Sequence, residues 1–151
     1  WVMRPRQVEN RGIDPQLFDF LCGRWLAPVH KALAVDLAYL GEGKAGMRMK
    51  AGHEYSTVRG RLHGGIMSTV LDTAMGWALL SLGYNPMTTD MYMNYLAPVF
   101  EDTELAADAH VIHLGNRTAV AEAAMHDDQG RLVATSRATF AIKKIKPRSE
   151  L

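Results

Sequence analysis

The sequence predicts an α+β fold in which one long helix packs on an antiparallel sheet of about six strands. The helix is predicted because apolar residues recur at helical spacing from 66 to 82, with no proline between them. The sheet is predicted from six strand-like segments, several of them joined by short turns that suit hairpins. The chain has 151 residues, 48% of them hydrophobic, and is therefore long enough to bury one such core.

The first part of the chain is predicted to be a polar arm followed by a short helix. Asp14 is a suitable N-cap and Pro15 suits a first helical turn, so a helix is expected at 15–24. No repeat or low-complexity segment divides the rest of the chain. We therefore expect two parts: 1–27 as an N-terminal arm and short helix, and 28–151 as a single domain.

Six segments of that domain are predicted to be strands. Two of them precede the long helix, and four follow it after a turn at 83–86. Their ranges are 32–40, 44–51, 87–96, 104–114, 118–126 and 131–142. The strands would leave one face of the sheet for the helix to cover.

The start of the long helix is the most informative place in the chain. Gly64 and Gly65 have no Cβ, so a ligand can approach backbone N–H groups that have no partner within the helix. The positive end of the helix dipole lies at the same place and favours negative charge that develops on a carbonyl oxygen. We therefore predict an oxyanion hole at Gly64 or Gly65.

Asp72 supplies a carboxylate further along the same helix. It lies eight residues after Gly64, which is roughly 12 Å along a straight helix. One carbonyl carbon cannot contact both groups within one chain, so a site that uses both needs the antiparallel helix of a second copy. On its residues alone, Asp72 could equally be a solvated side chain or one that bonds locally beside Thr69 and Thr73.

The motif His63-Gly64-Gly65, followed by Asp72 and Gly76, resembles the signature of hotdog-fold thioesterases of the PaaI-like type, in the 4-hydroxybenzoyl-CoA thioesterase superfamily. The likeness spans about residues 28–142 and includes three further segments. These are 88–98, which resembles the family's central strand, and the turns at 115–118 and 127–134. The resemblance implies a hotdog fold and hydrolysis of an acyl-CoA thioester to a free acid and coenzyme A. Coenzyme A is then part of the substrate, and no separate cofactor is expected.

The resemblance also implies roles for the residues of the motif. The amide of Gly64 or Gly65 would polarise the thioester carbonyl, and Asp72 of the neighbouring subunit would act as nucleophile or general base. Thr88 falls where related thioesterases place a hydroxyl that positions the attacking water, although on its residue type alone it could be an ordinary strand residue. His63 is expected to anchor the loop and orient the helix head.

Five further residues are candidates for contacting the substrate. Two methionines of the long helix suit the walls of an acyl pocket, and two arginines suit the phosphates of coenzyme A. A loop threonine stands where the family commonly has Asn, whose amide offers more hydrogen bonds than a hydroxyl. The five are Thr57, Met67, Met75, Arg117 and Arg137. The basic tail at 143–148 is either a further phosphate contact or a solvating charged end.

Composition and missing motifs exclude several other classes of protein. The net charge of +1 gives no general reason to expect nucleic acid or an anionic membrane as a partner. No apolar run approaches about 18 residues, so we expect a soluble, cytoplasmic protein. Cys22 is the only cysteine, and the sequence has neither a zinc-ligand spacing nor a Gly-x-Ser-x-Gly motif. No disulfide, metal or serine nucleophile is therefore expected.

The expected partners are the acyl-CoA substrate and further copies of the chain, as a dimer or a dimer of dimers. Two alternatives stay open. The same fold could bind acyl-CoA without cleaving it, as a sensor. Related hotdog proteins also hydrate or dehydrate acyl thioesters, although the His and acidic arrangement usual for them is missing from the helix.

Overall fold

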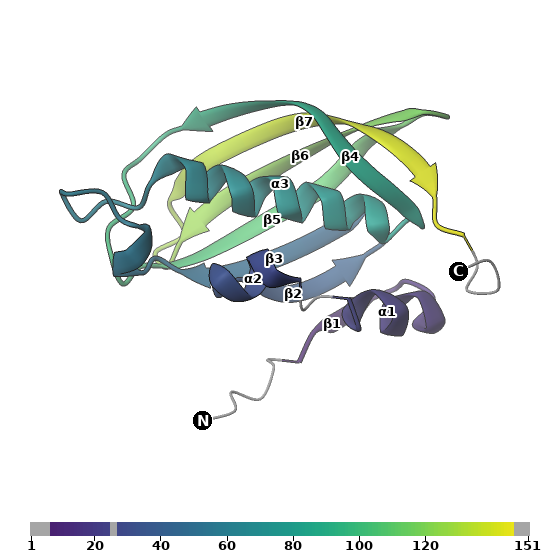
Figure 1. Ribbon diagram of the computed structural model, residues 1–151, viewed down its shortest axis with the longest axis horizontal. Helices are drawn as coiled ribbons and strands as arrows, with labels where there is room; N and C mark the ends of the chain where they lie inside the picture. The colour runs from purple at the N-terminus through teal and green to yellow at the C-terminus, as the bar shows by residue number, and fades with distance from the viewer. Residues whose placement is uncertain (1–6, 25–26, 147–151) are drawn as a thin grey trace.

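A sheet of seven strands curves around one long helix in the computed structural model, which describes residues 7–24 and 27–146 (Figure 1). The N-terminal part holds β1 (Glu9–Arg11), α1 (Pro15–Cys22) and α2 (Pro28–Ala32). The strands β2 (Asp36–Gly41) and β3 (Lys44–Lys50), a 3-10 turn (His53–Tyr55) and the long helix α3 (Gly64–Leu80) follow. The chain then forms β4 (Tyr84–Tyr95), β5 (Glu104–Leu114), β6 (Thr118–Asp127) and β7 (Leu132–Lys144).

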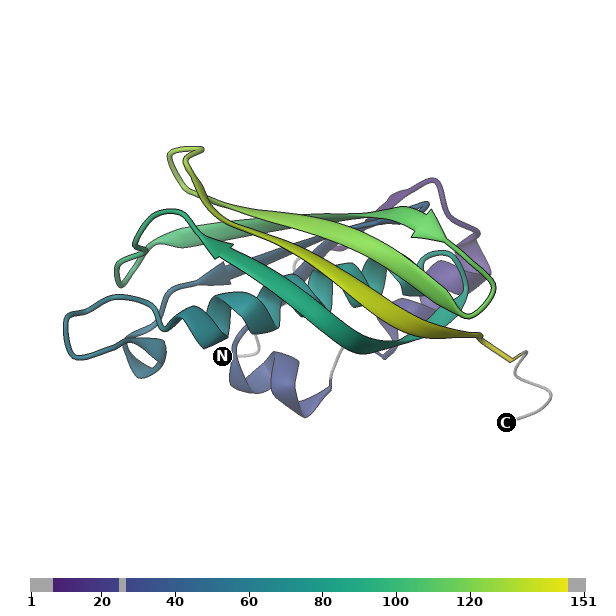
Figure 2. The same ribbon diagram turned by 90° about the horizontal axis from the view of Figure 1, so that it is seen from above.

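The strands lie in the order β1-β2-β3-β5-β6-β7-β4, so β4 and β1 form the two edges of the sheet. All neighbouring strands are antiparallel except β1 and β2, which are parallel. Seen from above, α3 lies along one face of the sheet, and α2 lies on the far side of α3 from the sheet (Figure 2). The sheet and α3 therefore enclose the core. The side of α3 that points away from the sheet is its outer face.

The core is built from the apolar stripe of α3 and the inner face of the sheet. Alanines occupy the buried positions at the centre of β5 and β6, which lets the helix lie close to the strands. Larger side chains fill the rest of the core. They include Met67, Leu71, Met75, Leu79 and Phe140, each at most 3% exposed.

The first strand of the domain and the turn after α3 differ from the sequence-based expectation. Pro28 begins the short helix α2 rather than only ending α1, because proline suits a first helical turn as well as a helix exit. The strand expected at 32–40 therefore starts later, at Asp36. The turn expected at 83–86 is also shorter, since β4 already begins at Tyr84.

The sheet has one strand more than the six expected, because β1 adds a seventh strand in parallel to β2. All three residues of β1 are exposed and polar, so they carry no hydrophobic pattern. The strand is held by contacts that only the tertiary structure creates. The guanidinium of Arg11 lies over the ring of Tyr39 on β2, with Cζ 3.6 Å from the ring centroid.

None of the helices in the described part of the chain is long and apolar enough to cross a membrane.

Candidate active site

Three hydrogen bonds fix the backbone at the head of α3. The N–H of His63 donates to the carbonyl oxygen of Tyr55 at 2.9 Å, which anchors the preceding loop. The N–H of Gly65 donates to Nδ1 of His63 at 2.9 Å, so the His63 side chain is the N-cap of the helix. The hydroxyl of Tyr95, the last residue of β4, donates to the carbonyl oxygen of Gly64 at 3.2 Å.

These bonds distinguish the two glycines of the motif. The N–H of Gly65 is occupied by His63, whereas no residue within 7–24 or 27–146 accepts a hydrogen bond from the N–H of Gly64. Gly64 is the first residue of α3, where backbone N–H groups point away from the helix along its axis. The N–H of Gly64 is therefore the one at the helix head that is open to a ligand.

Asp72 and Thr88, which lie sixteen residues apart, are in direct contact. The Thr88 hydroxyl on β4 donates to Oδ1 of Asp72 at 2.7 Å, because β4 runs beside α3. The carboxylate is partly buried on the outer face of α3, and Thr88 is exposed in the single chain. One carboxylate oxygen is thus held in place, and the described residues make no hydrogen bond to the other.

Asp72 and Thr88 line a cavity of about 360 Å³ that the N-terminal helices help to form. Leu21 of α1, Arg24 and His30 of α2 are part of its wall. The His30 ring also packs edge-on against Trp77 of α3, with ring centroids 6.3 Å apart. Sequence patterns did not indicate that the N-terminal segment reaches this place, since the contacts join residues more than forty positions apart.

A second cavity of about 500 Å³ adjoins the first and is bordered by cations. The two cavities share Arg24, Asn85 and Pro86 in their walls. The far side of the second cavity is lined by Lys143, Lys144 and Lys146. A larger hollow of about 1140 Å³ between α1 and the end of β7 contains neither Asp72 nor Gly64 in its wall.

The two methionine candidates lie in the core. Met67 is 3% exposed and Met75 is fully buried, and both belong to the stripe of α3 that packs on the sheet. Asp72 lies on another face of the helix, and neither methionine is among the described residues that line its cavity. The structure therefore separates these side chains from the carboxylate within one chain.

The remaining candidates also lie outside the cavity that holds Asp72. Arg137 forms an ion pair with Glu122, its Nε 2.9 Å from Oε1, on the exposed face of the sheet. Arg117 is exposed in the turn between β5 and β6. Thr57 is exposed in a tight turn, where its N–H donates to the carbonyl oxygen of Arg61 at 2.7 Å.

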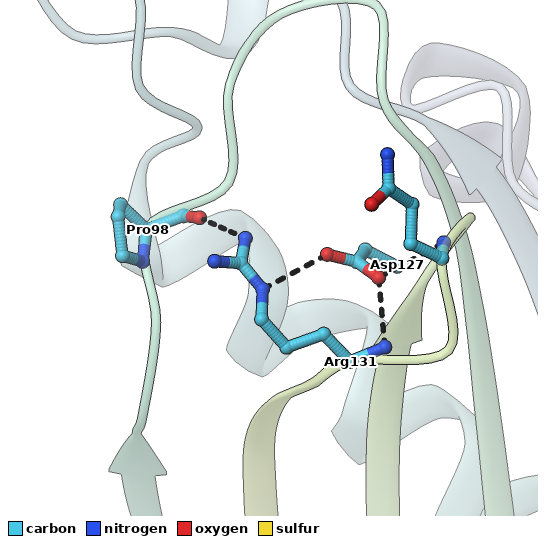
Figure 3. Close-up of polar contacts among 4 residues, drawn as sticks. Pro98, Asp127 and Arg131 are labelled. Atoms are coloured by element: carbon cyan, nitrogen blue, oxygen red, sulfur yellow. Dashed lines mark hydrogen bonds and ion pairs between the residues drawn. The ribbon is translucent and has the colours of Figure 1, made fainter.

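The turn between β6 and β7 contacts the loop that follows β4 (Figure 3). The Arg131 guanidinium donates to Oδ2 of Asp127 at 3.0 Å and to the carbonyl oxygen of Pro98 at 3.2 Å. The next carbonyl, that of Val99, accepts the N–H of Leu62 at 2.8 Å, immediately before the His-Gly-Gly motif. Asp127 and Arg131 thus brace the segment from which the helix head starts.

Among residues 7–24 and 27–146, no three or more His, Cys, Asp or Glu side chains gather in a way that could hold a metal ion.

Known proteins resemble this chain over most of its length. Residues 59–134 match the family model of the Thioesterase superfamily. Acyl-coenzyme A thioesterase PaaI of Escherichia coli K12 is 30% identical over 107 residues, which is 71% of this chain and 76% of that protein. Human acyl-coenzyme A thioesterase 13 is 29% identical over 108 residues, which is 70% of this chain and 77% of that protein.

The fold itself matches a solved structure of the E. coli PaaI protein, from the phenylacetic acid degradation operon. The TM-score is 0.83 at 24% sequence identity, and the match covers 89% of this chain and 100% of that one. A long helix wrapped by the sheet is therefore the hotdog fold that the sequence motif implies. The chain belongs to the thioesterase superfamily, and it is a hotdog-fold thioesterase of the PaaI-like type.

Proposed function

We propose that this thioesterase hydrolyses an acyl-CoA thioester to a free acid and coenzyme A, in an active site that two subunits share. The names of the E. coli and human relatives support the substrate class. The observation that carries the proposal is the 2.7 Å hydrogen bond from Thr88 to Asp72, which holds one carboxylate oxygen beside a cavity and leaves the other open. A carboxylate held in this way can attack a carbonyl carbon or take a proton from water.

In the proposed reaction, the N–H of Gly64 donates to the oxygen of the thioester carbonyl. The dipole of α3 adds to the stabilisation of the negative charge that forms there. Asp72 of the partner subunit either takes a proton from the attacking water or attacks the carbonyl carbon to give an anhydride that water then opens. In both routes the C–S bond breaks, and the coenzyme A thiolate leaves and takes up a proton.

The edge strand β4 supports the proposal that two subunits combine. It is twelve residues long and hydrogen-bonded to β7 alone among the described strands. Several of its apolar side chains are strongly exposed in the single chain, with Met87 at 71% and Tyr92 at 67%. A long, apolar sheet edge is normally covered by another strand. Pairing of β4 with β4 of a second copy about a two-fold axis would continue the sheet.

The outer face of α3 also suits contact with a second copy of the helix. The hydroxyl of Thr69 donates to the carbonyl oxygen of Gly65, and that of Thr73 to the carbonyl oxygen of Thr69. Both threonines therefore donate their hydroxyl groups within the helix and are only partly buried in the single chain. Thr73 and Gly76 line the cavity that the N-terminal helices help to form, whereas Thr69 does not. An antiparallel helix could therefore lie against the first half of α3, around Thr69, with its Gly64 near Asp72.

The adjoining cationic cavity is the proposed place for the phosphates of coenzyme A. Asn85 pairs with Lys143, and Thr88 with Phe140, along the β4–β7 ladder. Lys143 therefore lies three residues, or about 10 Å of strand, beyond the partner of Thr88. Arg24 lies in the walls of both cavities. Arg137, in contrast, already has Glu122 as a partner.

The first test distinguishes the effect of losing the Gly64 N–H from the effect of adding a side chain at this position. Gly64→Pro removes the N–H and suits the first helical position, and His63 before it already has the extended backbone that precedes proline (ψ 130). Gly64→Ala is the matched control, since it keeps the N–H but adds the same Cβ, 3.0 Å from the Tyr95 ring. We expect kcat to fall on the order of 100-fold in Gly64→Pro, and much less in Gly64→Ala.

Thiol release from acetyl-, hexanoyl-, dodecanoyl- and benzoyl-CoA is the measurement, with circular dichroism as the check of folding. Asp72→Asn is assayed beside the glycine variants, and its kcat should fall by about 100-fold or more. Cleavage of all four thioesters by folded Asp72→Asn at the wild-type rate would contradict the proposal. Tight binding of an acyl-CoA without thiol release by the wild type would instead identify a sensor.

A further inference from the structure

Tyr95 contacts the head of α3 in two ways. Its hydroxyl donates to the carbonyl oxygen of Gly64 at 3.2 Å. Its ring fills the space next to that glycine, because a Cβ placed on Gly64 would lie 3.0 Å from Cε1 and 3.2 Å from Cζ of Tyr95. The phenol therefore takes the place that a side chain at residue 64 would occupy.

These contacts hold the peptide group that follows Gly64 at both ends. Its carbonyl oxygen accepts the Tyr95 hydroxyl, and its N–H, that of Gly65, donates to Nδ1 of His63. The peptide group that precedes Gly64 carries the open N–H, and its carbonyl, that of His63, accepts the N–H of Ile66 at 3.0 Å. It is joined to the first peptide group through the Cα of Gly64, so contacts on both sides of that Cα set its direction. A glycine rotates more freely about that Cα than any other residue, so the open N–H depends on its neighbours for a fixed direction.

We propose that Tyr95 is a positioning residue for the oxyanion donor. It holds the carbonyl side of Gly64 and packs against the Cα, so that the N–H of Gly64 keeps one direction while charge develops on the thioester oxygen. A donor that is already oriented stabilises a transition state without the cost of reorganisation. The inference rests on the proposed function, since it takes the N–H of Gly64 as the donor.

Removal of the hydroxyl alone tests this role by kinetics. Tyr95→Phe keeps the ring, and we expect kcat to fall by about 5- to 20-fold, less than for loss of a donor itself, with KM changed by less than about twofold. Tyr84→Phe is the matched control, because Tyr84 lies at the other end of β4 and its hydroxyl makes no hydrogen bond to the described residues. Its kcat should equal that of the wild type. Equal kcat values for Tyr95→Phe and wild type would overturn the inference.

A spectroscopic measurement distinguishes a positioning role from a purely structural one. The probe is the carbonyl-¹³C form of whichever of the four acyl-CoA thioesters the wild type cleaves fastest, bound to the Asp72→Asn variant. A hydrogen bond from Gly64 lowers the infrared stretching frequency of the bound thioester carbonyl. In the double variant Asp72→Asn/Tyr95→Phe, we expect that frequency to return part of the way toward its value in free solution.

The outcomes separate the inference from the proposed function. A lowered frequency that is the same in both variants would overturn the role of Tyr95 and leave the donor in place. No lowering in Asp72→Asn itself, or continued cleavage by that variant, would overturn the proposed function and the inference with it. A partial return in the double variant, with the thermal midpoint unchanged, supports both.

Discussion

Asp127 shows how one side chain can hold a turn together and orient an arginine toward a neighbouring loop. Its Oδ1 accepts the N–H of Arg131 at 2.8 Å and that of Gln129 at 3.0 Å, and its Oδ2 accepts the Arg131 guanidinium (Figure 3). The N–H of Arg131, together with these other donors, lowers the pKa of the Asp127 carboxyl below its ordinary value. The ionised form is therefore the one that the folded protein favours.

The lowered pKa predicts how stability depends on pH. The stabilisation from ionised Asp127 is fully present above the ordinary carboxyl pKa of about 4, and it is lost as the pH falls through the lower pKa of the folded protein. Asp127→Asn should therefore melt below the wild type by a constant interval above about pH 5. That interval should narrow below about pH 4.

Thermal unfolding of both proteins across this pH range is the measurement. Asp128→Asn is the matched control, because Asp128 is the exposed neighbour in the same turn and accepts none of these bonds among the described residues. An interval for Asp127→Asn that stays the same from neutral to acid pH would show that its charge does not stabilise the fold.

The sequence identifies candidate site residues, but it does not show which of two similar residues is available to a ligand. Gly64 and Gly65 are equivalent in a pattern of helix-start amides, and only the bond from Gly65 to His63 Nδ1 distinguishes them. The likeness to thioesterases indicated Asp72 and Thr88, and the structure places them 2.7 Å apart, although their roles stay predictions. The place of His30 in the wall of the Asp72 cavity could not be predicted from the sequence, because it depends on how the N-terminal helices fold back onto α3.

Among the elements, β1 pairs with β2 and also contacts a tyrosine on that strand that lies opposite a glycine. Tyr39 on β2 donates its hydroxyl to Asp108 on β5 at 2.6 Å, and the Arg11 guanidinium covers its ring. The ring lies across Gly46, its partner on β3. A Cβ on Gly46 would lie 2.1 Å from Cε1 of the ring. The ring therefore cannot move away from a new side chain without loss of one of its partners.

Gly46→Ala is accordingly expected to lower the free energy of unfolding by about 1–3 kcal/mol, the usual cost of forcing an extra group into a packed site. In a Tyr39→Ala background the clash is absent, so the same glycine substitution should cost little. Urea unfolding of the two single variants and the double variant measures this coupling. An equal cost of Gly46→Ala in both backgrounds would show that the tyrosine ring is not the obstacle.

Elements with a strong local pattern are predictable from the sequence, and those without one are not. The structure confirms α3 to within two residues at either end and β5 at its predicted bounds, 104–114. In contrast, α2 has five residues and β1 has three, which is too short to show a period. The pairing of β1 with β2 joins the polar residues of β1 to Tyr39, Leu40 and Gly41, thirty positions further along the chain, and only tertiary contacts specify it.

For the whole molecule, the length of α3 makes one chain an incomplete catalyst under the proposed mechanism. Gly64 and Asp72 lie eight residues apart on the same helix, which is about 12 Å along the axis. An acyl carbonyl bound at the head of one helix therefore needs the Asp72 carboxylate of another chain. Each dimer would hold two sites, and each site would combine Gly64 of one subunit with Asp72 and Thr88 of the other.

Mixing of inactive variants tests this sharing directly. If Asp72→Asn and Gly64→Pro chains are unfolded together and refolded in equal amounts, about half of the dimers will contain one chain of each kind. One site of such a dimer carries both substitutions, and the other carries neither. The mixture should therefore regain about a quarter of the wild-type rate of thiol release, although each variant alone is almost inactive.

The control mixes Asp72→Asn with Thr88→Ala, whose residues contact each other within one chain. Both sites of that mixed dimer then carry one substitution, because the carboxylate and its threonine always come from the same subunit. No rate above the average of the two variants is expected. Recovery in the first mixture but not in the second therefore assigns Gly64 to one subunit and the Asp72–Thr88 pair to the other. Failure of both mixtures to recover, with dimers present in sedimentation, would place the whole site within a single chain.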